Sequence, residues 1–149
     1  LIDEVTHYLN EQHKIHTSKI GNIVLTTHSG GYKVTAAILH QGGMTKNIMD
    51  VILLDSSYGS LEWFVDWIKA SPRRRLVSMY TDHLAATNKE FMGMFDKLGI
   101  KYQQLDETTM TDADLAKRGV TFFHTKGPHD HVPVEYFGRM IRTSELGKE

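Results

Sequence analysis

The stretch IVLTTHSGGY, residues 23–32, joins a strand pattern to a helix pattern through a short turn. It begins with apolar and β-branched residues, which are typical of buried strands. Ser29 is followed at once by Gly30 and Gly31, and a helical pattern starts at Tyr32. A serine on so sharp a bend between a strand and a helix is the feature from which the fold and the function are both predicted.

Strand and helix patterns alternate along the rest of the chain. Strands are predicted at residues 23–27, 51–55, 76–80, 100–105 and 120–124. Helices are predicted at residues 1–9, 32–40, 61–68, 87–98 and 112–118, and from residue 133 onward. The helix at 87–98 has the clearest start, because Thr87 and Glu90 have the spacing of a capping box. The strands are apolar throughout rather than at every second residue, so we predict an α/β fold with a mostly parallel sheet and helices on both faces.

Length and composition restrict the classes of protein to consider. The 149 residues suit one domain. The net charge is -1 at pH 7, with 17 lysines and arginines against 18 acidic residues, so nothing favours a nucleic acid or an anionic membrane as partner. The chain has no cysteine and therefore no disulfide or thiolate chemistry. No apolar run approaches the roughly 20 residues that a membrane-spanning helix needs.

Polar residues with catalytic potential follow several of the predicted strands. In open parallel sheets, ligands bind at the carboxyl ends of the strands. A serine hydroxyl becomes a good nucleophile when a base takes its proton, and histidine is the usual base. A carboxylate then orients the imidazole and stabilises its cation. The residues of these three types that follow predicted strands are Ser29, Asp55, Asp82, His124, His129 and His131.

The sequence THSGG, residues 27–31, approximates the nucleophile elbow G-x-S-x-G. In this motif a strained turn lifts the serine above the sheet edge, and small residues on either side let the strand and helix approach closely. Gly31 meets that need, whereas Thr27 stands where glycine is usual. Gly30 would offer its backbone N–H, at the start of the helix, as one oxyanion donor.

The order serine, aspartate, histidine along the chain is the order of the α/β-hydrolase fold. With this order and its approximate elbow, the chain resembles the C-terminal portion of an α/β-hydrolase over essentially all of residues 1–149. The resemblance implies an acyl-transfer hydrolase that acts on an ester, thioester or amide bond without a cofactor. It implies Ser29 as nucleophile, Asp82 as orienting acid and a histidine of the segment 129–131 as base.

Two assignments within this triad stay open. His129 is preferred as the base and His131 is the alternative, because both lie in the predicted loop before the last helix; His124 is a third choice. Asp55 is the alternative acid, because some members of the resembled family carry the acid one strand earlier.

The surroundings of the predicted site suggest a substrate surface and a partner. His28, beside the serine, and Tyr58 are candidate substrate contacts, whereas Trp63 and Trp67 are expected to pack in the core. In the resembled family, strands that precede the elbow build half of the sheet and supply the second oxyanion donor. We therefore expect the domain at 1–149 to lack the N-terminal half of that fold, and expect that half, or self-association, to cover the edge of the elbow strand.

Two other functions fit part of the sequence. Asp82, His83, His129 and His131 offer the oxygen and nitrogen ligands of a divalent-metal-dependent hydrolase. A non-catalytic α/β domain would instead use the turn at residues 29–31 to bind a phosphate or carboxylate at the start of a helix.

Overall fold

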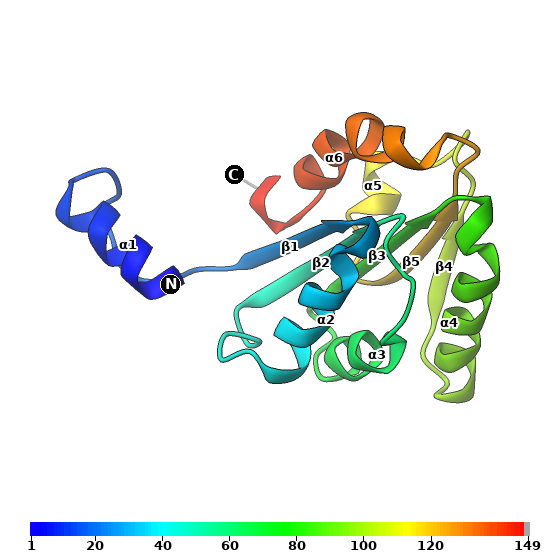
Figure 1. The fold of residues 1–149 in the computed structure, drawn as a ribbon, viewed down its shortest axis with the longest axis horizontal. Helices are drawn as coiled ribbons and strands as arrows, with labels where there is room; N and C mark the ends of the chain where they lie inside the picture. The colour runs from blue at the N-terminus through cyan, green and yellow to red at the C-terminus, as the bar shows by residue number, and fades with distance from the viewer. Residues whose placement is uncertain (148–149) are drawn as a thin grey trace.

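The computed structural model describes residues 1–147 and contains a five-stranded sheet in which every strand is parallel to its neighbours (Figure 1). The strand order is β1-β2-β3-β5-β4. The strands are β1 (Ile23–His28), β2 (Ile48–Leu54), β3 (Arg75–Tyr80), β4 (Tyr102–Leu105) and β5 (Gly119–His124). The helices are α1 (Ile2–Glu11), α2 (Tyr32–Gln41), α3 (Leu61–Lys69), α4 (Ala85–Lys97), α5 (Asp112–Leu115) and α6 (Val132–Arg142). Each predicted strand overlaps an observed one, and the predicted α/β fold is confirmed.

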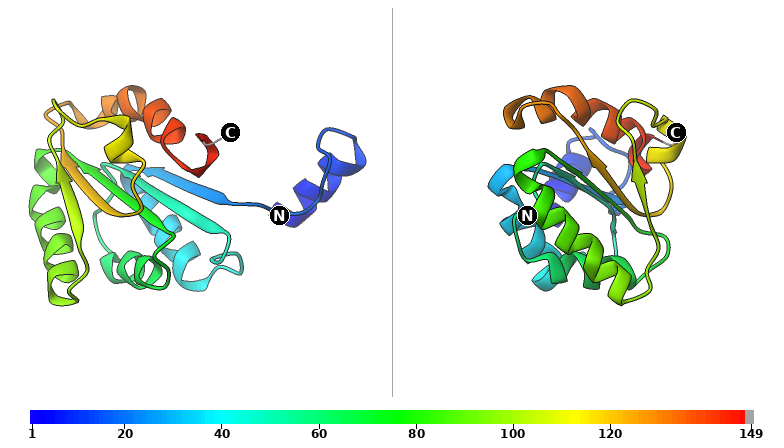
Figure 2. Two further views of the ribbon diagram at one scale, coloured as in Figure 1. Left: turned by 180° about the vertical axis from the view of Figure 1, so that it is seen from behind. Right: turned by 90° about the vertical axis from the view of Figure 1, so that its right-hand side faces the viewer.

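Helices cover both faces of the sheet, as the apolar strands require. Helices α2, α3 and α4 lie on one face, and α5 and α6 lie on the other (Figures 1 and 2). Successive residues of β2 point to opposite faces, so that Leu53 packs in the first core and Ile52 and Leu54 pack in the second. Every residue of β2 is buried. Among the described helices, none has both the length and the apolar character needed to cross a membrane.

Short 3₁₀ turns connect strands β1, β3 and β5 to the helices that follow them. They are η1 (Ser29–Gly31), η2 (Asp82–Leu84) and η3 (His129–His131). Each turn carries polar residues that the sequence singled out as candidates. Because all strands run in the same direction, these three turns meet at one edge of the sheet.

The predicted capping box of α4 is wrong. This helix begins at Ala85, directly after η2, so Thr87 lies inside its first turn and no side chain caps its start. A capping box is present instead at α5, where Thr111 accepts from the N–H of Asp114, and the Asp114 side chain accepts from the N–H of Thr111. The turn η2 leads directly into α4, so the helix begins before Thr87.

Helix α1 and the outer edge of β1 have few contacts with the rest of the chain. In Figures 1 and 2 α1 lies well apart from the sheet, and none of its residues is buried. Its apolar side chains Ile2, Val5 and Tyr8 are exposed. Strand β1 pairs with β2 on one side and forms an edge on the other. We expect that a further segment or a second copy covers this side, and that residues 1–149 form one incomplete domain. Both stay predictions. Residues 148–149 lie outside the described part of the chain.

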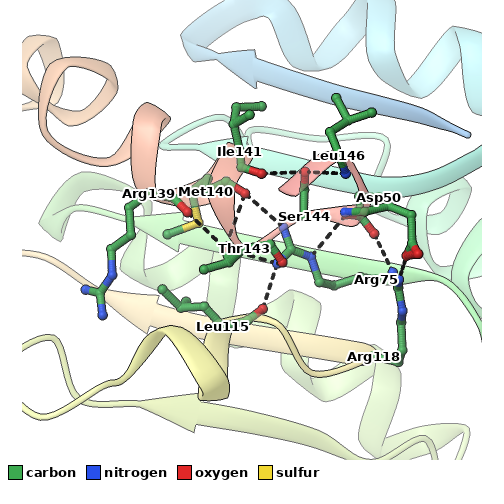
Figure 3. A network of polar contacts seen from close by, with 11 residues as sticks. Asp50, Arg75, Leu115, Arg118, Arg139, Met140, Ile141, Thr143, Ser144 and Leu146 are labelled. Carbon is green, nitrogen blue, oxygen red and sulfur yellow. Dashed lines mark hydrogen bonds and ion pairs between the residues drawn. The ribbon is translucent and has the colours of Figure 1, made fainter. Parts of the chain in front are cut away.

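A buried arginine anchors the end of the sheet opposite to the three turns. Arg75, the first residue of β3, is fully buried and donates to the carbonyl oxygens of Leu115 and Thr143, both at 2.7 Å, and of Met140 at 3.3 Å (Figure 3). These bonds tie β3 to the ends of α5 and α6. Burial lowers the pKa of the Arg75 guanidinium, and the negative charge of Asp50 opposes that shift.

Asp50 connects this anchor to β2 and to the C-terminal turn. Its carboxylate is fully buried and lies 3.6 Å from Nε of Arg75 and 2.7 Å from the guanidinium of Arg118. It also accepts from the backbone N–H of Glu145 at 2.7 Å. One carboxylate therefore joins β2, β3 and the chain after α6 at the amino end of the sheet.

We predict that Arg75→Met destabilises the protein strongly, because it removes the fully buried cation beside Asp50 and the donor to three carbonyl oxygens. The expected loss in free energy of unfolding is about 3–5 kcal/mol, measured by urea denaturation. The matched control is Arg73→Met at an exposed position, where a change within about 0.5 kcal/mol is expected. Similar losses in both variants would contradict the anchoring role of Arg75.

Candidate active site

Ser29 occupies a strained turn at the end of β1. Its φ is 55°, in the left-handed region that side chains other than glycine rarely adopt. The hydroxyl of Ser56, which follows β2, donates to the carbonyl oxygen of Ser29 at 2.6 Å. This hydrogen bond ties the strained turn to the neighbouring strand and holds Ser29 at the edge of the sheet.

Close packing requires a glycine at position 31, two residues after the serine. A Cβ atom at Gly31 would lie 2.3 Å from Oγ1 of Thr27, whereas one at Gly30 would meet no heavy atom within 4 Å. The strand end and the helix start therefore touch through Thr27 and Gly31. The threonine that departs from the elbow pattern fits because its partner in this contact has no side chain.

Asp55 is the second strained residue at this edge, with a φ of 49° directly after β2. Its side chain is fully buried. Thr81, just after β3, donates its backbone N–H to Oδ1 and its hydroxyl to Oδ2, both at 2.8 Å. The same Oδ2 lies 2.6 Å from Nδ1 of His129. One buried carboxylate thus connects the ends of β2 and β3 to the turn η3.

His129 is held in one orientation and one tautomer. Its side chain is 28% exposed, and its ring packs against that of His28 with 4.4 Å between centroids. Nε2 of His28 also lies 3.1 Å from the backbone oxygen of His129, so the turn at β1 contacts the turn after β5 directly. Because an ionised carboxylate only accepts hydrogen bonds, Nδ1 of His129 carries the proton. Nε2 then keeps its lone pair, as a general base requires.

A partly buried polar cluster fixes the loop that carries His129. Thr125, at the start of the loop, and Tyr136, on α6, both donate to the carboxylate of Glu107. Burial and the bond to Glu107 raise the pKa of Tyr136 to about 12. Burial opposes ionisation of Glu107, but the hydrogen bonds from Thr125 and Tyr136 outweigh it and lower the pKa of that carboxyl. The loop is therefore attached on both sides of His129.

A second histidine reaches Asp55 through Thr81. Nδ1 of His83 lies 2.7 Å from Oγ1 of Thr81 and 3.7 Å from Oδ2 of Asp55. Since the Thr81 hydroxyl donates to Asp55, it accepts from Nδ1 of His83, and Nε2 of His83 is left as an acceptor. The phenol of Tyr58 lies 2.8 Å from that Nε2 and donates to it.

This chain of hydrogen bonds ends at Ser29. The side chain of Ser29 is hydrogen-bonded to Tyr58. The phenol of Tyr58 donates its proton to His83, so its oxygen accepts from the hydroxyl of Ser29. Burial raises the pKa of Tyr58, the bond from Ser29 opposes the shift, and the negative charge of Asp55 adds to it. In this structure the hydroxyl of Ser29 therefore points to Tyr58.

The predicted residues divide into two groups. The structure gathers Ser29, Asp55 and His129, with His28 and Tyr58, at one edge of the sheet. Asp82 lies apart from His129: its carboxylate is 91% exposed and pairs with Nε2 of His124 at 2.7 Å. His131 is exposed on η3, and Gly30 is the middle residue of η1, the turn into α2. The expected packing of the tryptophans is seen in Trp67, which is buried in the core.

Sequence reasoning missed Thr81 and gave His83 only a metal-binding role. Thr81 comes directly after β3, where the strand-end rule looks for functional residues. A search for every polar residue at these positions, and not only for carboxylates and histidines, would have found it.

The structure also rearranges the predicted metal ligands. Asp82 pairs with His124, and His131 is exposed, whereas His83 and His129 converge on Asp55. One ligand atom from each of these three residues lies within 4.8 Å of the others. The candidate triad and the candidate metal ligands therefore share Asp55 and His129.

Comparisons with protein-family models, with curated proteins and with solved structures found no match for this chain.

We predict that Gly31→Ala destabilises the elbow, because the new methyl group would overlap Oγ1 of Thr27. Overpacking of this kind costs about 1–3 kcal/mol of unfolding free energy, measured by urea denaturation. Gly30→Ala is the matched control and should change stability much less. Adding Thr27→Ala to Gly31→Ala should recover part of the loss. Equal stability of the two alanine variants would show that strand and helix do not touch here.

Proposed function

We propose that this protein is a serine hydrolase of the α/β-hydrolase type. Ser29 is the nucleophile, His129 the general base and Asp55 the acid that orients it. One observation carries the proposal: Ser29 occupies a left-handed turn after β1, and the ring of His28, the residue before it, packs against His129, whose imidazole is paired with the buried carboxylate of Asp55. No cofactor takes part.

The reaction begins with attack of Ser29 Oγ on the carbonyl carbon of an acyl substrate. The hydroxyl turns from Tyr58 to His129, and its proton passes to Nε2 as the new C–O bond forms. Asp55 stabilises the resulting imidazolium through Nδ1–H, because its carboxylate is fully buried and lies 2.6 Å away. The imidazolium then gives its proton to the leaving group as the scissile bond breaks, and an acyl ester remains on Ser29.

Water completes the cycle. His129 takes a proton from a water molecule, which attacks the acyl ester, and returns that proton to Ser29 as the acid product leaves. The backbone N–H of Gly30 would stabilise the oxyanion in both halves of the reaction. His28 and Tyr58 flank the serine and would contact the acyl group. Esters, thioesters, amides and peptides all suit this chemistry.

The geometry favours Asp55 over Asp82 as the acid. An orienting carboxylate acts on one nitrogen of the base, and Asp55 contacts Nδ1 of His129, whereas Asp82 contacts His124. An acid directly after the strand that follows the elbow strand resembles the variant arrangement within the family.

A partner remains part of the proposal. The open edge of β1 lies on the side where the resembled family has further strands, and the apolar side chains of α1 are exposed. We propose that a further segment or a second copy pairs with this edge and adds an oxyanion donor. Removing one such donor costs about 3–4 kcal/mol of transition-state stabilisation in a known serine hydrolase.

We predict that His129→Ala abolishes reaction with a fluorophosphonate, which requires the activated serine. The rate of labelling should fall by about 10²–10⁴-fold, because the general base is lost. His131→Ala is the matched control, two residues away on the same turn, and should label within a few-fold of the parent. The reverse pattern would transfer the role of base to His131. Labelling of neither protein, together with saturable phosphate binding, would favour the anion-binding hypothesis.

We predict that Asp55→Asn slows fluorophosphonate labelling of Ser29 far more than Asp82→Asn does. The asparagine oxygen can still accept from Thr81, but its amide would face Nδ1 of His129 and favour the wrong tautomer. Labelling should slow by about 10⁴-fold, the effect of the same exchange in a serine protease triad. Circular dichroism should show that both variants are folded. Comparable rates for Asp55→Asn and the parent, with a large loss in Asp82→Asn, would restore Asp82 as the acid.

A further inference from the structure

The carboxylate of Asp55 is buried without a permanently charged partner. Its side chain has no exposed surface, and within residues 1–147 its ion-pair partners are the histidines His83 and His129. No lysine or arginine pairs with it in that part of the chain. A buried carboxylate is costly unless opposite charge or strong hydrogen bonds compensate it, so this site favours a cation.

The atoms around Asp55 match the ligand types and spacing of a zinc site. Nδ1 of His129 and Nδ1 of His83 lie 2.6 and 3.7 Å from the same Oδ2. Zinc bonds of about 2.0–2.1 Å place neighbouring ligands of a tetrahedral ion roughly 3.3 Å apart, between these two distances. One ligand atom from each of the three residues lies within 4.8 Å of the others, so modest side-chain movements would let them share one ion. Two imidazoles and one carboxylate leave a fourth position open.

We propose that Asp55, His83 and His129 bind one Zn²⁺ ion, and that this ion inhibits the hydrolase. The site itself stands on its geometry, whereas the inhibition rests on the proposed function. Zinc would replace the Nδ1 protons of both histidines, and these protons would move to Nε2 or to solvent. His129 would then lose its bond to Asp55 and, with Nε2 protonated, its ability to accept the proton of Ser29.

The partly exposed His83 makes the proposal separable from the triad. Its side chain is 45% exposed, so its removal should leave the fold intact. It contacts Tyr58 and Thr81, whereas the bond between Asp55 and His129 does not involve it. Zinc binding and the carboxylate-imidazole pair can therefore be tested apart.

The first test measures zinc binding to the full chain after dialysis against a chelator, by isothermal titration calorimetry. The parent and Ser29→Ala should each bind one Zn²⁺, because Ser29 is not a ligand. His83→Ala should bind at least about tenfold more weakly, since even changes around the ligands cost 10–100-fold. His131→Ala is the matched control and should bind like the parent. No binding by the parent, or equal binding by His83→Ala, would overturn the proposal.

The second test measures the rate of fluorophosphonate labelling with and without zinc. For each variant, the rate with zinc is divided by the rate without it. Zinc should slow labelling of the parent, an excess of chelator should reverse the effect, and the ratio should be near one in His83→Ala. Faster labelling or hydrolysis with zinc would overturn the inhibitory role and favour a metal-dependent hydrolase. The parent could also bind zinc as expected but never react with the probe. That result would support the zinc site and overturn both the proposed function and the inhibition.

Discussion

The hydrogen bond between the buried carboxylate of Asp55 and Nδ1 of His129 connects parts of the chain that lie 74 residues apart. The carboxylate also accepts twice from Thr81, so one side chain joins the ends of β2 and β3 to the loop after β5. The imidazole in turn packs against His28, which precedes the strained serine. Without Asp55 the ends of β2 and β3 would lose their direct connection to the imidazole of His129, and the chemistry we propose depends on that connection.

Two buried carboxylates lie near opposite ends of β2, Asp50 within the strand and Asp55 directly after it. Asp50 pairs with Arg75 and Arg118 at the amino end, where the contacts fix α5, α6 and the chain that follows them. Asp55 lies at the carboxyl end and pairs only with titratable histidines among the described residues. The first arrangement is a permanent ion pair that stabilises the fold. The second has no permanently charged partner among the described residues, and the triad that we propose is built on it.

Local patterns were sufficient to predict the strands, most helices and the turn at Ser29, because each depends on residues near one another in sequence. They could not decide between Asp55 and Asp82. Both acids follow buried strands, and the choice depends on the left-handed backbone at Asp55, on the donors of Thr81 and on where the loop of His129 lies. These are properties of the assembled sheet. The capping box at Thr87 failed for a similar reason, since the preceding turn already leads into the helix.

The most direct test of this account is a crystal structure of the protein after reaction with a fluorophosphonate. We expect phosphorus bonded to Oγ of Ser29, a phosphonyl oxygen facing the N–H of Gly30, and Nε2 of His129 directed at the adduct, with Nδ1 still on Asp55. An adduct on another residue, or one that His83 rather than His129 contacts while Asp55 and His129 have separated, would contradict the proposed triad.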